Sequence, residues 1–436
     1  MASISGKEKT FNAYQIFIIA LLAFLQFTII LDFMVLSPLS ALLMPELNIT
    51  ATQFSIVVSA YAFSAAISGL LAAGFADKFD RKKILIFFYT GFIIGTILCG
   101  IAPDYNFLLF ARIITGIFGG VIGSVILAIS TDLFPMHVRG RVMGFLQMAF
   151  AASQILGIPV GLYLANETNW HAPFILIASV SILVYFVILF KMKPVTDHLL
   201  IKKEKSATRH LIDTLTKKRY LTGFAATTLL TTGGFMLMPF GSVFSVHNLG
   251  IRLEQLPLVY MITGISTMIF GPFIGILSDK LGKYNLFLAG SILSMILVLI
   301  YCNLGITPLW AVILVNVILF IGITSRMIAA SALMSAVPEP ADRGAFMGIN
   351  SSVQQFSGGL AAFAAGLIVV QKDSGFMEHY DILGYVVVVA MIITAVMMKV
   401  INTMVKVKGD GDRKEPIAHL PKTVIINEPA NNVTPV

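Results

Sequence analysis

Long apolar runs separated by short polar segments dominate the pattern along the chain. The runs at residues 11–43, 51–76 and 221–246 extend for about twenty residues or more with almost no charge, enough to cross a hydrocarbon core of roughly 30 Å. The pattern therefore predicts an all-α membrane protein with twelve transmembrane helices. The other nine predicted spans are residues 84–102, 106–132, 141–165, 171–191, 256–278, 285–304, 308–335, 345–370 and 381–404.

The sequence repeats itself about halfway along. Residues 139–144, Arg-Gly-Arg-Val-Met-Gly, return as Arg-Gly-Ala-Phe-Met-Gly at residues 343–348, which is 204 positions later. Asp77 and its following lysine return as Asp279 and its lysine, 202 positions later. Two pseudo-symmetric six-helix bundles, 1–191 and 221–405, are therefore predicted, an arrangement suited to rocking about a central site.

Composition excludes a soluble globular chain. Hydrophobic residues make up 57% of the sequence and charged residues 12%, and the mean hydropathy is +0.89. The first apolar run is too long for a signal-peptide core and has no small-residue cleavage site, so we expect it to remain as a helix. The two cysteines lie in apolar runs without the spacing of a metal site, and no cofactor or metal is expected.

The net charge of +8 is explained by membrane topology rather than by a nucleic-acid partner. If both termini are cytoplasmic, all but four of the 30 Lys and Arg residues lie on the inner side, as the positive-inside rule requires. The exceptions are Arg252 and Lys372 outside, and Arg112 and Arg326 within helices. We expect a monomeric, multi-pass protein of a bacterial inner membrane whose partners are lipid, protons and a small molecule.

Two polar segments complete the predicted organisation. Residues 192–220 are basic and form the predicted cytoplasmic linker between the bundles. It is expected to lie along the inner membrane surface, where each basic residue gains about 1 kcal/mol from anionic lipid. Residues 406–436 are rich in Pro, Asn and charge, which predicts a disordered cytoplasmic tail.

Several motifs identify a family. Residues 73–83, Ala-Gly-Phe-Ala-Asp-Lys-Phe-Asp-Arg-Lys-Lys, resemble the signature loop between helices 2 and 3 of the major facilitator superfamily. Residues 112–116, Arg-Ile-Ile-Thr-Gly, resemble its second motif. The Arg-Gly-x-x-Met-Gly start of helix 5 and residues 169–174 at helix 6 extend the resemblance over the chain. The similarity is greatest to the twelve-span drug:proton antiporter and sugar-efflux-like group.

The chain also departs from the family pattern. The signature loop of the family has glycines where this chain has Ala73 and Asp80. The antiporter motif of helix 5 normally reads Gly-Pro with Gly-Gly two residues later, and this chain keeps Pro159 with the flanking Gly157 and Gly161. The motif therefore does not assign antiport by itself.

The resemblance and the spacing of charges suggest a gate at the inner end of the bundle. Asp77 can cap a helix N-terminus of the opposite half, while Arg81 pairs with Asp132 at the inner end of helix 4. Such contacts would hold one state and break in the other. A solvated cluster that only sets topology is the alternative. The corresponding candidates elsewhere are Arg139, Asp279 and Arg343.

Ionisable residues inside apolar runs are the sharpest functional signal, because a charge in the membrane survives only in a cavity or a pair. With helix 1 ending near Met44, Asp32 is expected ~18 Å below the outer surface, and Arg112 lies ~9 Å deep on helix 4 with a long side chain. The two can meet. A small rearrangement would then move Asp32 between charged and neutral forms, as a proton carrier requires. A permanent structural ion pair is the alternative.

Other residues are candidates for the substrate site. Arg326, near the middle of helix 10, would suit a carboxylate-bearing ligand or would bond backbone carbonyls. Polar residues on apolar helices could line a cavity or bond across helices. They are Tyr61, Gln147, Gln154, Asn316, Gln354 and Gln355.

These observations favour a proton-coupled exporter of small amphipathic compounds or metabolites, with Asp32 as the proton carrier. The alternatives are a symporter or facilitator that imports an organic anion through Arg112 and Arg326, and a membrane sensor that transports nothing. An enzyme is disfavoured because the sequence lacks a His-rich metal cluster, a Gly-x-Ser-x-Gly elbow and a Walker loop.

Overall fold

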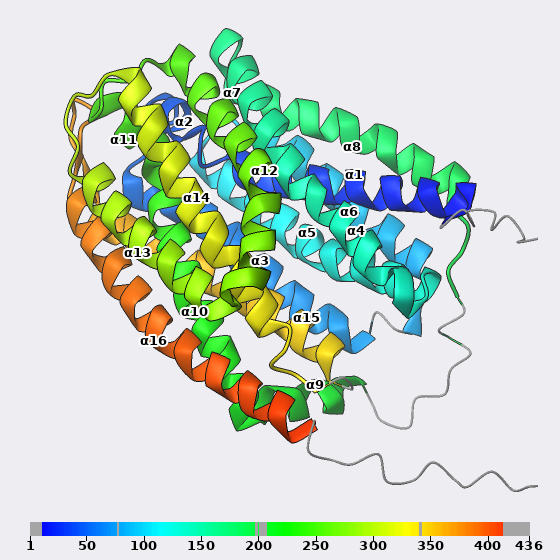
Figure 1. Ribbon diagram of the computed structural model, residues 1–436. Coiled ribbons are helices and arrows are strands. Elements are labelled where there is room, and N and C mark those ends of the chain that lie inside the picture. The colour runs from blue at the N-terminus through cyan, green and yellow to red at the C-terminus, as the bar shows by residue number, and fades with distance from the viewer. Residues whose placement is uncertain (1–10, 76–77, 197–198, 200–206, 340–341, 413–436) are drawn as a thin grey trace, which may run out of the picture.

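The computed structural model describes residues 11–75, 78–196, 199, 207–339 and 342–412. Nearly all of this part is helical (Figure 1). The first half contains α1 (Ala13–Val35), α2 (Ser40–Glu46), α3 (Ala51–Phe75), α4 (Arg81–Gly100), α5 (Tyr105–Leu133), α6 (Met136–Ala152), the π-helix η2 (Ser153–Gly157), α7 (Ile158–Glu167) and α8 (Ala172–Lys191).

The second half begins after a short helix, α9 (Ala207–Thr216), in the linker. A two-residue antiparallel strand pair, β1 and β2, joins the last two helices. The elements are α10 (Lys218–Leu237), the 3₁₀ turn η4 (Met238–Phe240), α11 (Gly241–His247), η5 (Leu253–Gln255), α12 (Leu256–Leu281), α13 (Lys283–Cys302), α14 (Leu309–Met334), α15 (Arg343–Ile368), β1 (Val370–Gln371), β2 (Met377–Glu378) and α16 (Tyr380–Asp412).

Eleven helical segments in the described ranges are long and apolar enough to cross a membrane. α6 to α7 counts as one of them, and so does α10 to α11. The remaining long helix, α15, is more polar because it contains Asn350, Gln354 and Gln355 along with several serines. Length and composition thus support a multi-pass membrane protein, with α15 outside the apolar set.

Local capping explains where several helices begin. At α1, Asn12 and Gln15 form a reciprocal capping box, with Oδ1 of Asn12 accepting from the Gln15 N–H at 2.8 Å. At α5, Oδ1 of Asp104 accepts from the Phe107 N–H at 2.9 Å. A turn at Pro38 separates α1 from α2, so the apolar run at residues 11–43 is not one helix.

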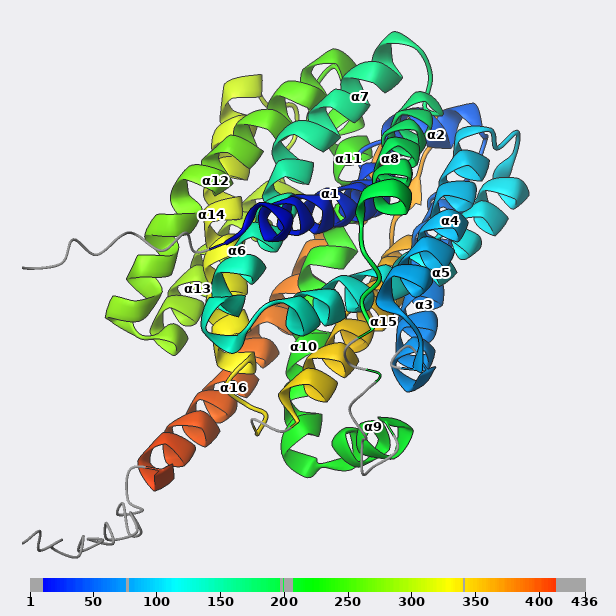
Figure 2. The same cartoon turned by 90° about the vertical axis from the view of Figure 1, so that its right-hand side faces the viewer.

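The helices run between two ends of the bundle (Figures 1 and 2). We call the end that carries α9 the linker end, and the end that carries α2 and α11 the far end. In Figure 1 the two halves meet at the far end and diverge toward the linker end.

The hydrophobic cores are also shared at the far end and separate at the linker end. At the far end, one hydrophobic cluster contains buried residues of both halves, among them Val35, Phe54 and Phe240. Toward the linker end each half has its own cluster, around Leu85 in the first half and Phe287 in the second. The halves are thus packed together at the far end and separately at the linker end.

Hydrogen bonds reinforce the contact at the far end. The hydroxyls of Ser40 and Ser242 lie 3.1 Å apart, and Ser242 donates to the Pro38 carbonyl at 2.8 Å. All three residues are at the junctions of α2 and α11 with the longer helices. These bonds join the two halves directly and are buried.

The boundaries of two predicted segments change. α16 continues to Asp412, whereas the predicted disordered tail begins at 406; the remaining tail, 413–436, lies outside the described residues. The linker at 192–220 contains α9 and the start of α10. Hydropathy misses α9 because the helix is polar, and in the structure it packs against α3, α10 and α15.

Candidate functional site

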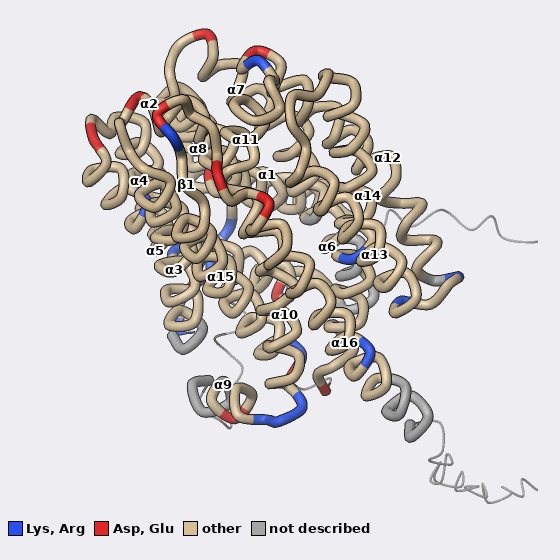
Figure 3. The backbone as a smooth tube through the Cα atoms, turned by 90° about the vertical axis from the view of Figure 1, so that its left-hand side faces the viewer, with Lys and Arg blue, Asp and Glu red and all other residues tan. Residues whose placement is uncertain are grey.

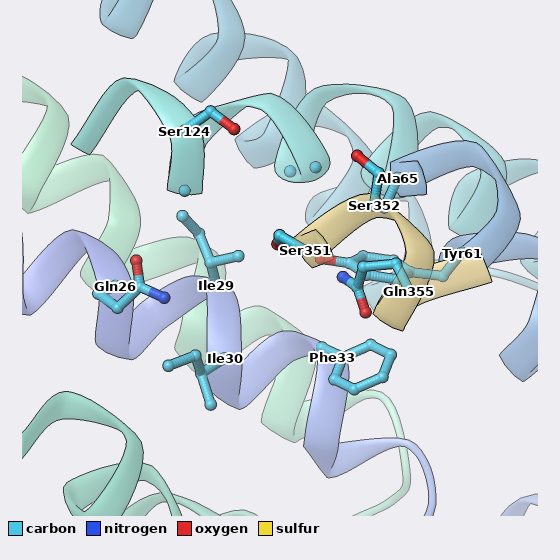
Figure 4. Close-up of a pocket in the computed structure, with 13 residues that line it drawn as sticks. Gln26, Ile29, Ile30, Phe33, Tyr61, Ala65, Ser124, Ser351, Ser352 and Gln355 are labelled. Carbon is cyan, nitrogen blue, oxygen red and sulfur yellow. The ribbon is translucent and has the colours of Figure 1, made fainter. Parts of the chain in front are cut away.

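A cavity of about 140 Å³ lies between α1, α3 and α5 of the first half and α15 of the second (Figure 4). Apolar atoms come from Ile29, Ile30 and Phe33. None of the lining residues is Asp, Glu, Lys or Arg, so the wall within the described part is neutral. Its polar side chains are those of Gln26, Tyr61, Ser124, Ser351, Ser352 and Gln355.

Glycines of α5 allow this cavity to form beside closely packed helices. Gly119, Gly120 and Gly123 line it. A Cβ at Gly120 would meet the backbone of Ala65 on α3, whereas a Cβ at Gly123 would meet nothing within 4 Å. The small residues at this interface therefore set how closely α5 approaches α3.

This difference gives a matched pair of variants. Gly120→Ala is expected to destabilise the protein by about 1–3 kcal/mol, because backbone atoms must move apart to admit the methyl group. Gly123→Ala is expected to be neutral or slightly stabilising, since alanine is the better helix former and has room there. Thermal unfolding in detergent compares the two, and equal midpoints would contradict the packing argument.

Behind the cavity wall lies a buried ion pair between α1 and α5. Nη1 of Arg112 donates to Oδ2 of Asp32 at 2.8 Å, and the side chains of Arg112 and Asp32 are 1% and 0% exposed. Thr96 of α4 donates its hydroxyl to the second carboxylate oxygen at 3.1 Å. The carboxylate is thus held on both oxygens, as a buried charge requires.

Tyr61 separates this pair from the cavity. The guanidinium carbon of Arg112 lies 4.4 Å from the centroid of the Tyr61 ring, a cation–π contact. The ring also lies against Phe33, with centroids 5.2 Å apart, and both aromatic residues line the cavity. A ligand that moves Tyr61 would therefore act directly on Arg112.

The expected contact between Asp32 and Arg112 is present, but one assumption behind it is wrong. The apolar pattern predicts that helix 1 ends near Met44, whereas α1 ends at Val35. Asp32 consequently lies in the last turn of α1, close to the turn that precedes α2. The pair forms because α1, α4 and α5 converge there.

At the linker end, Nε of Arg81 donates to Oδ2 of Asp132 at 2.9 Å, joining α4 to the end of α5. Asp77 lies outside the described residues, as do the side chains of Arg139 and Asp279. Arg343 is exposed at the first residue of α15.

Asp80, a departure from the family pattern, has a structural function. Its Oδ1 accepts from the N–H groups of Lys82 at 2.9 Å and Val195 at 3.0 Å. The Val195 carbonyl in turn accepts from the Arg81 N–H at 3.2 Å. The N-terminus of α4 is therefore capped by a carboxylate and covered by the chain that follows α8.

Arg326 is not among the residues that line this cavity. It is 4% exposed, and its guanidinium carbon is 5.7 Å from the centroid of the Phe287 ring in the core of the second half. Its Nε and Nη2 atoms have no hydrogen-bond partner among the described residues. The structure does not place this side chain on the neutral cavity wall.

The other polar candidates also differ in whether they line the cavity. On α15 the cavity is lined by Gln355, whereas Gln354 is not on its wall. Asn316 donates to the Val312 carbonyl of its own helix at 2.9 Å. Gln154 lies in η2, where its backbone approaches α12 at Gly264, and the side chain of Gln147 lies outside the described part.

The helix-5 motif packs against α1 near Asp32. A Cβ at Gly157 would meet the side chain of Leu31, and one at Gly161 would contact Val35. Pro159 stands in the first turn of α7, directly after the π-helix. These residues therefore set the fit of η2 and α7 on the end of α1.

Of the residues that line the cavity, only Tyr61 and Gln355 were site candidates from the sequence. Those that were not predicted include Gln26, Phe33, Ser124, Ser351 and Ser352. The cluster of serines and glutamines at residues 350–357 is the one signal that points to this part of α15. Gln26, like the predicted candidates, is a polar residue within an apolar run.

Comparison with known proteins places this architecture in a family. A family model described as Major Facilitator Superfamily matches residues 22–362 and 223–427. YbcL of Bacillus subtilis (strain 168), an uncharacterized MFS-type transporter, is 25% identical over 379 residues, covering 87% of this chain and 94% of that protein. The multidrug resistance protein MdtG of Escherichia coli O17:K52:H18 is 27% identical over 283 residues, covering 61% of this chain and 67% of that protein.

Solved structures share the fold. A bacterial homolog of the human lysosomal transporter Spinster, in an inward-facing and occupied conformation, has a TM-score of 0.71 at 14% identity, with 90% of this chain and 98% of that chain covered. The nucleoside transporter NupG has a TM-score of 0.69 at 14% identity, with 88% and 99% covered. From its helical architecture, and from a family match that spans most of its length, the chain belongs to the Major Facilitator Superfamily.

Proposed function

We propose that the chain exports small neutral or amphipathic compounds in exchange for protons, by alternating access between two six-helix halves. Membership of the superfamily makes it a secondary transporter rather than an enzyme. The observation that carries the finer proposal is the buried Asp32–Arg112 pair directly behind the neutral wall of an interhelical cavity. The similarity to a multidrug resistance protein supports export.

In this proposal, the two ends of the bundle lie on opposite sides of the membrane. Counting α15 as a span brings the eleven apolar segments to twelve, and the cavity that α15 lines accounts for its polar face. Lys and Arg gather toward the linker end (Figure 3), which is therefore the cytoplasmic side under the positive-inside rule. The far end carries acidic residues such as Glu46, Glu167 and Glu254. A shared core at the far end then corresponds to an inward-facing state.

Coupling follows from the contacts of Tyr61. Substrate that binds against Gln26, Tyr61 and Gln355 holds the Tyr61 ring and Arg112 against Asp32, so the carboxylate stays charged while substrate is bound. After substrate has left on the outer side, Arg112 loosens from Asp32, and a carboxylate enclosed by apolar surroundings without its cation takes up a proton. On the cytoplasmic side, the next substrate restores the pair and expels that proton, so proton and substrate move in opposite directions. The Arg81–Asp132 bond holds the linker-end arrangement in one state and breaks in the other.

Import of an organic anion is the second candidate, and the contacts favour it less. It requires a cation that faces the substrate. Arg112 is already paired with Asp32, and Arg326 packs against Phe287 rather than in the cavity. A neutral wall of amide and hydroxyl groups suits uncharged polar compounds better.

The deciding experiment uses purified protein in liposomes that contain a pH-sensitive dye. A panel of compounds is added under pH gradients of both signs. Export coupling predicts proton movement opposite to substrate movement, whereas symport predicts movement in the same direction. Substrate flux without proton movement would establish a facilitator, and no flux for any compound would favour a sensor.

Adjacent glutamines on α15 give a test of the cavity. Gln355→Leu removes a hydrogen-bonding group from the wall and is expected to raise KM for a polar substrate about fivefold, which corresponds to ~1 kcal/mol. Gln354→Leu makes the same chemical change one residue away, off the wall, and should leave KM near the parental value. Initial rates of counterflow measure both, and equal effects would contradict the assignment.

A further inference from the structure

The two halves differ at a pair of equivalent helix N-termini, those of α4 and α13. The interval of 202 residues that relates Asp77 to Asp279 also relates Asp80 to Gly282 and Arg81 to Lys283. In the first half, the Asp80 carboxylate caps α4 and Val195 covers it. In the second half, Gly282 supplies no side chain to cap α13. The position that the Asp80 carboxylate occupies in the first half therefore has no side chain in the second half.

A cavity of about 290 Å³ lies at this second position, at the linker end of α12, α13, α14 and α16. Ser278, Gly282, Lys283 and Asn402 contribute its polar lining, with Tyr284 and Asn285 beside them. α16 runs past this point to Asp412, and no segment within the described residues folds over the N-terminus of α13 as residues 192–195 fold over α4. In this part of the chain the cavity is therefore open, whereas the equivalent position of the first half is filled.

Ser278 indicates what the cavity would hold. This residue is only 4% exposed and lines the cavity, and its hydroxyl has no hydrogen-bond partner among the described residues. Lys283 is the one charged residue on the described lining. The Asn285 amide, by contrast, already donates to the Leu281 carbonyl at 2.9 Å. The unused groups are therefore donors: a hydroxyl, an ammonium and the first N–H groups of α13.

We propose that this cavity binds an external phosphate group, supplied by an anionic phospholipid, in the place that Asp80 occupies in the first half. A helix N-terminus with a basic residue and a hydroxyl is suited to a phosphate. The candidate spans at Leu253–Ser278 and Lys283–Cys302 end at the cavity, which puts it at headgroup level. Leu333 and Val405 add an apolar border for the glycerol and upper acyl carbons.

The test is a titration of the purified full chain in neutral detergent. Short-chain phosphatidylglycerol is expected to raise the unfolding midpoint in a saturable way, whereas short-chain phosphatidylcholine, whose choline cancels the phosphate charge, should not. Lys283→Gln should weaken the response about tenfold, because it removes a charge-assisted bond. Lys399→Gln, which removes a charge from an exposed position of α16 outside the cavity, should leave the response unchanged.

A second pair of variants tests the relation between the halves. Gly282→Asp supplies the carboxylate that Asp80 supplies in the first half, and it should abolish the response to phosphatidylglycerol. Gly282→Asn has the same shape and the same strain at a φ of 86°, without the charge, and should keep the response. Titration with inorganic phosphate distinguishes the sources: an equal, Lys283-dependent response identifies free phosphate as sufficient for the site. An unchanged response in both Lys283→Gln and Gly282→Asp would overturn the proposal.

Discussion

Asp32→Asn is expected to abolish uphill transport while substrate still exchanges down its gradient. The variant has no group at this position that can gain or lose a proton, so the coupled step is removed. Its amide oxygen can still accept from Arg112, and Thr96 can still bond the side chain, so the contacts of α1 with α4 and α5 are retained, while the buried guanidinium loses its counter-charge and stability falls. Substrate-induced proton movement in liposomes, measured at several pH values, should fall to background.

The matched control is Asp104→Asn. Asp104 is exposed and caps α5 at Phe107, and asparagine is an equally good N-cap. This variant undergoes the same change of carboxylate to amide and should transport and couple as the parent does. If Asp32→Asn still moves protons with substrate at the parental ratio, Asp32 is a packing residue and coupling resides elsewhere.

Arg112→Met should produce the largest loss of stability, about 3–5 kcal/mol, because the Asp32 carboxylate would remain buried without its cation. The double variant Asp32→Asn, Arg112→Met removes both charges and should recover a large part of that loss. Unfolding of the parent, both single variants and the double variant completes a mutant cycle. A double variant whose loss of stability equals the sum of the two single losses would show that the pair contributes little coupling energy.

Much of the helical architecture could be predicted because hydropathy reports directly on burial in lipid. The exceptions have physical causes. The turn at Pro38 is enclosed by apolar residues, so the run at residues 11–43 continues through it and conceals the boundary of α1 and α2. α9 and the β1–β2 pair are polar or too short to form a periodic pattern.

The charged residues of the candidate site could be predicted from the sequence. The residues whose position depends on how a helix is rotated about its axis could not. Asp32 and Arg112 stood out as charges in apolar helices, and they do contact each other. Gln354 and Gln355 are indistinguishable by composition, yet one residue turns a helix by about 100°, so only Gln355 reaches the cavity. The position of Arg326 over Phe287 likewise depends on the packing of α13 and α14.

The shared far-end core has a consequence for leakage in the absence of substrate. Opening that end would hydrate the apolar faces of both halves, at roughly 2.5 kcal/mol for each 100 Å² exposed. Every 1.4 kcal/mol makes the opened conformer tenfold rarer. A molecule without substrate would therefore adopt the opened conformer seldom, until a substrate with higher affinity for that conformer binds. If transport is coupled to protons as proposed, the same energy limits the leak of protons in the absence of substrate.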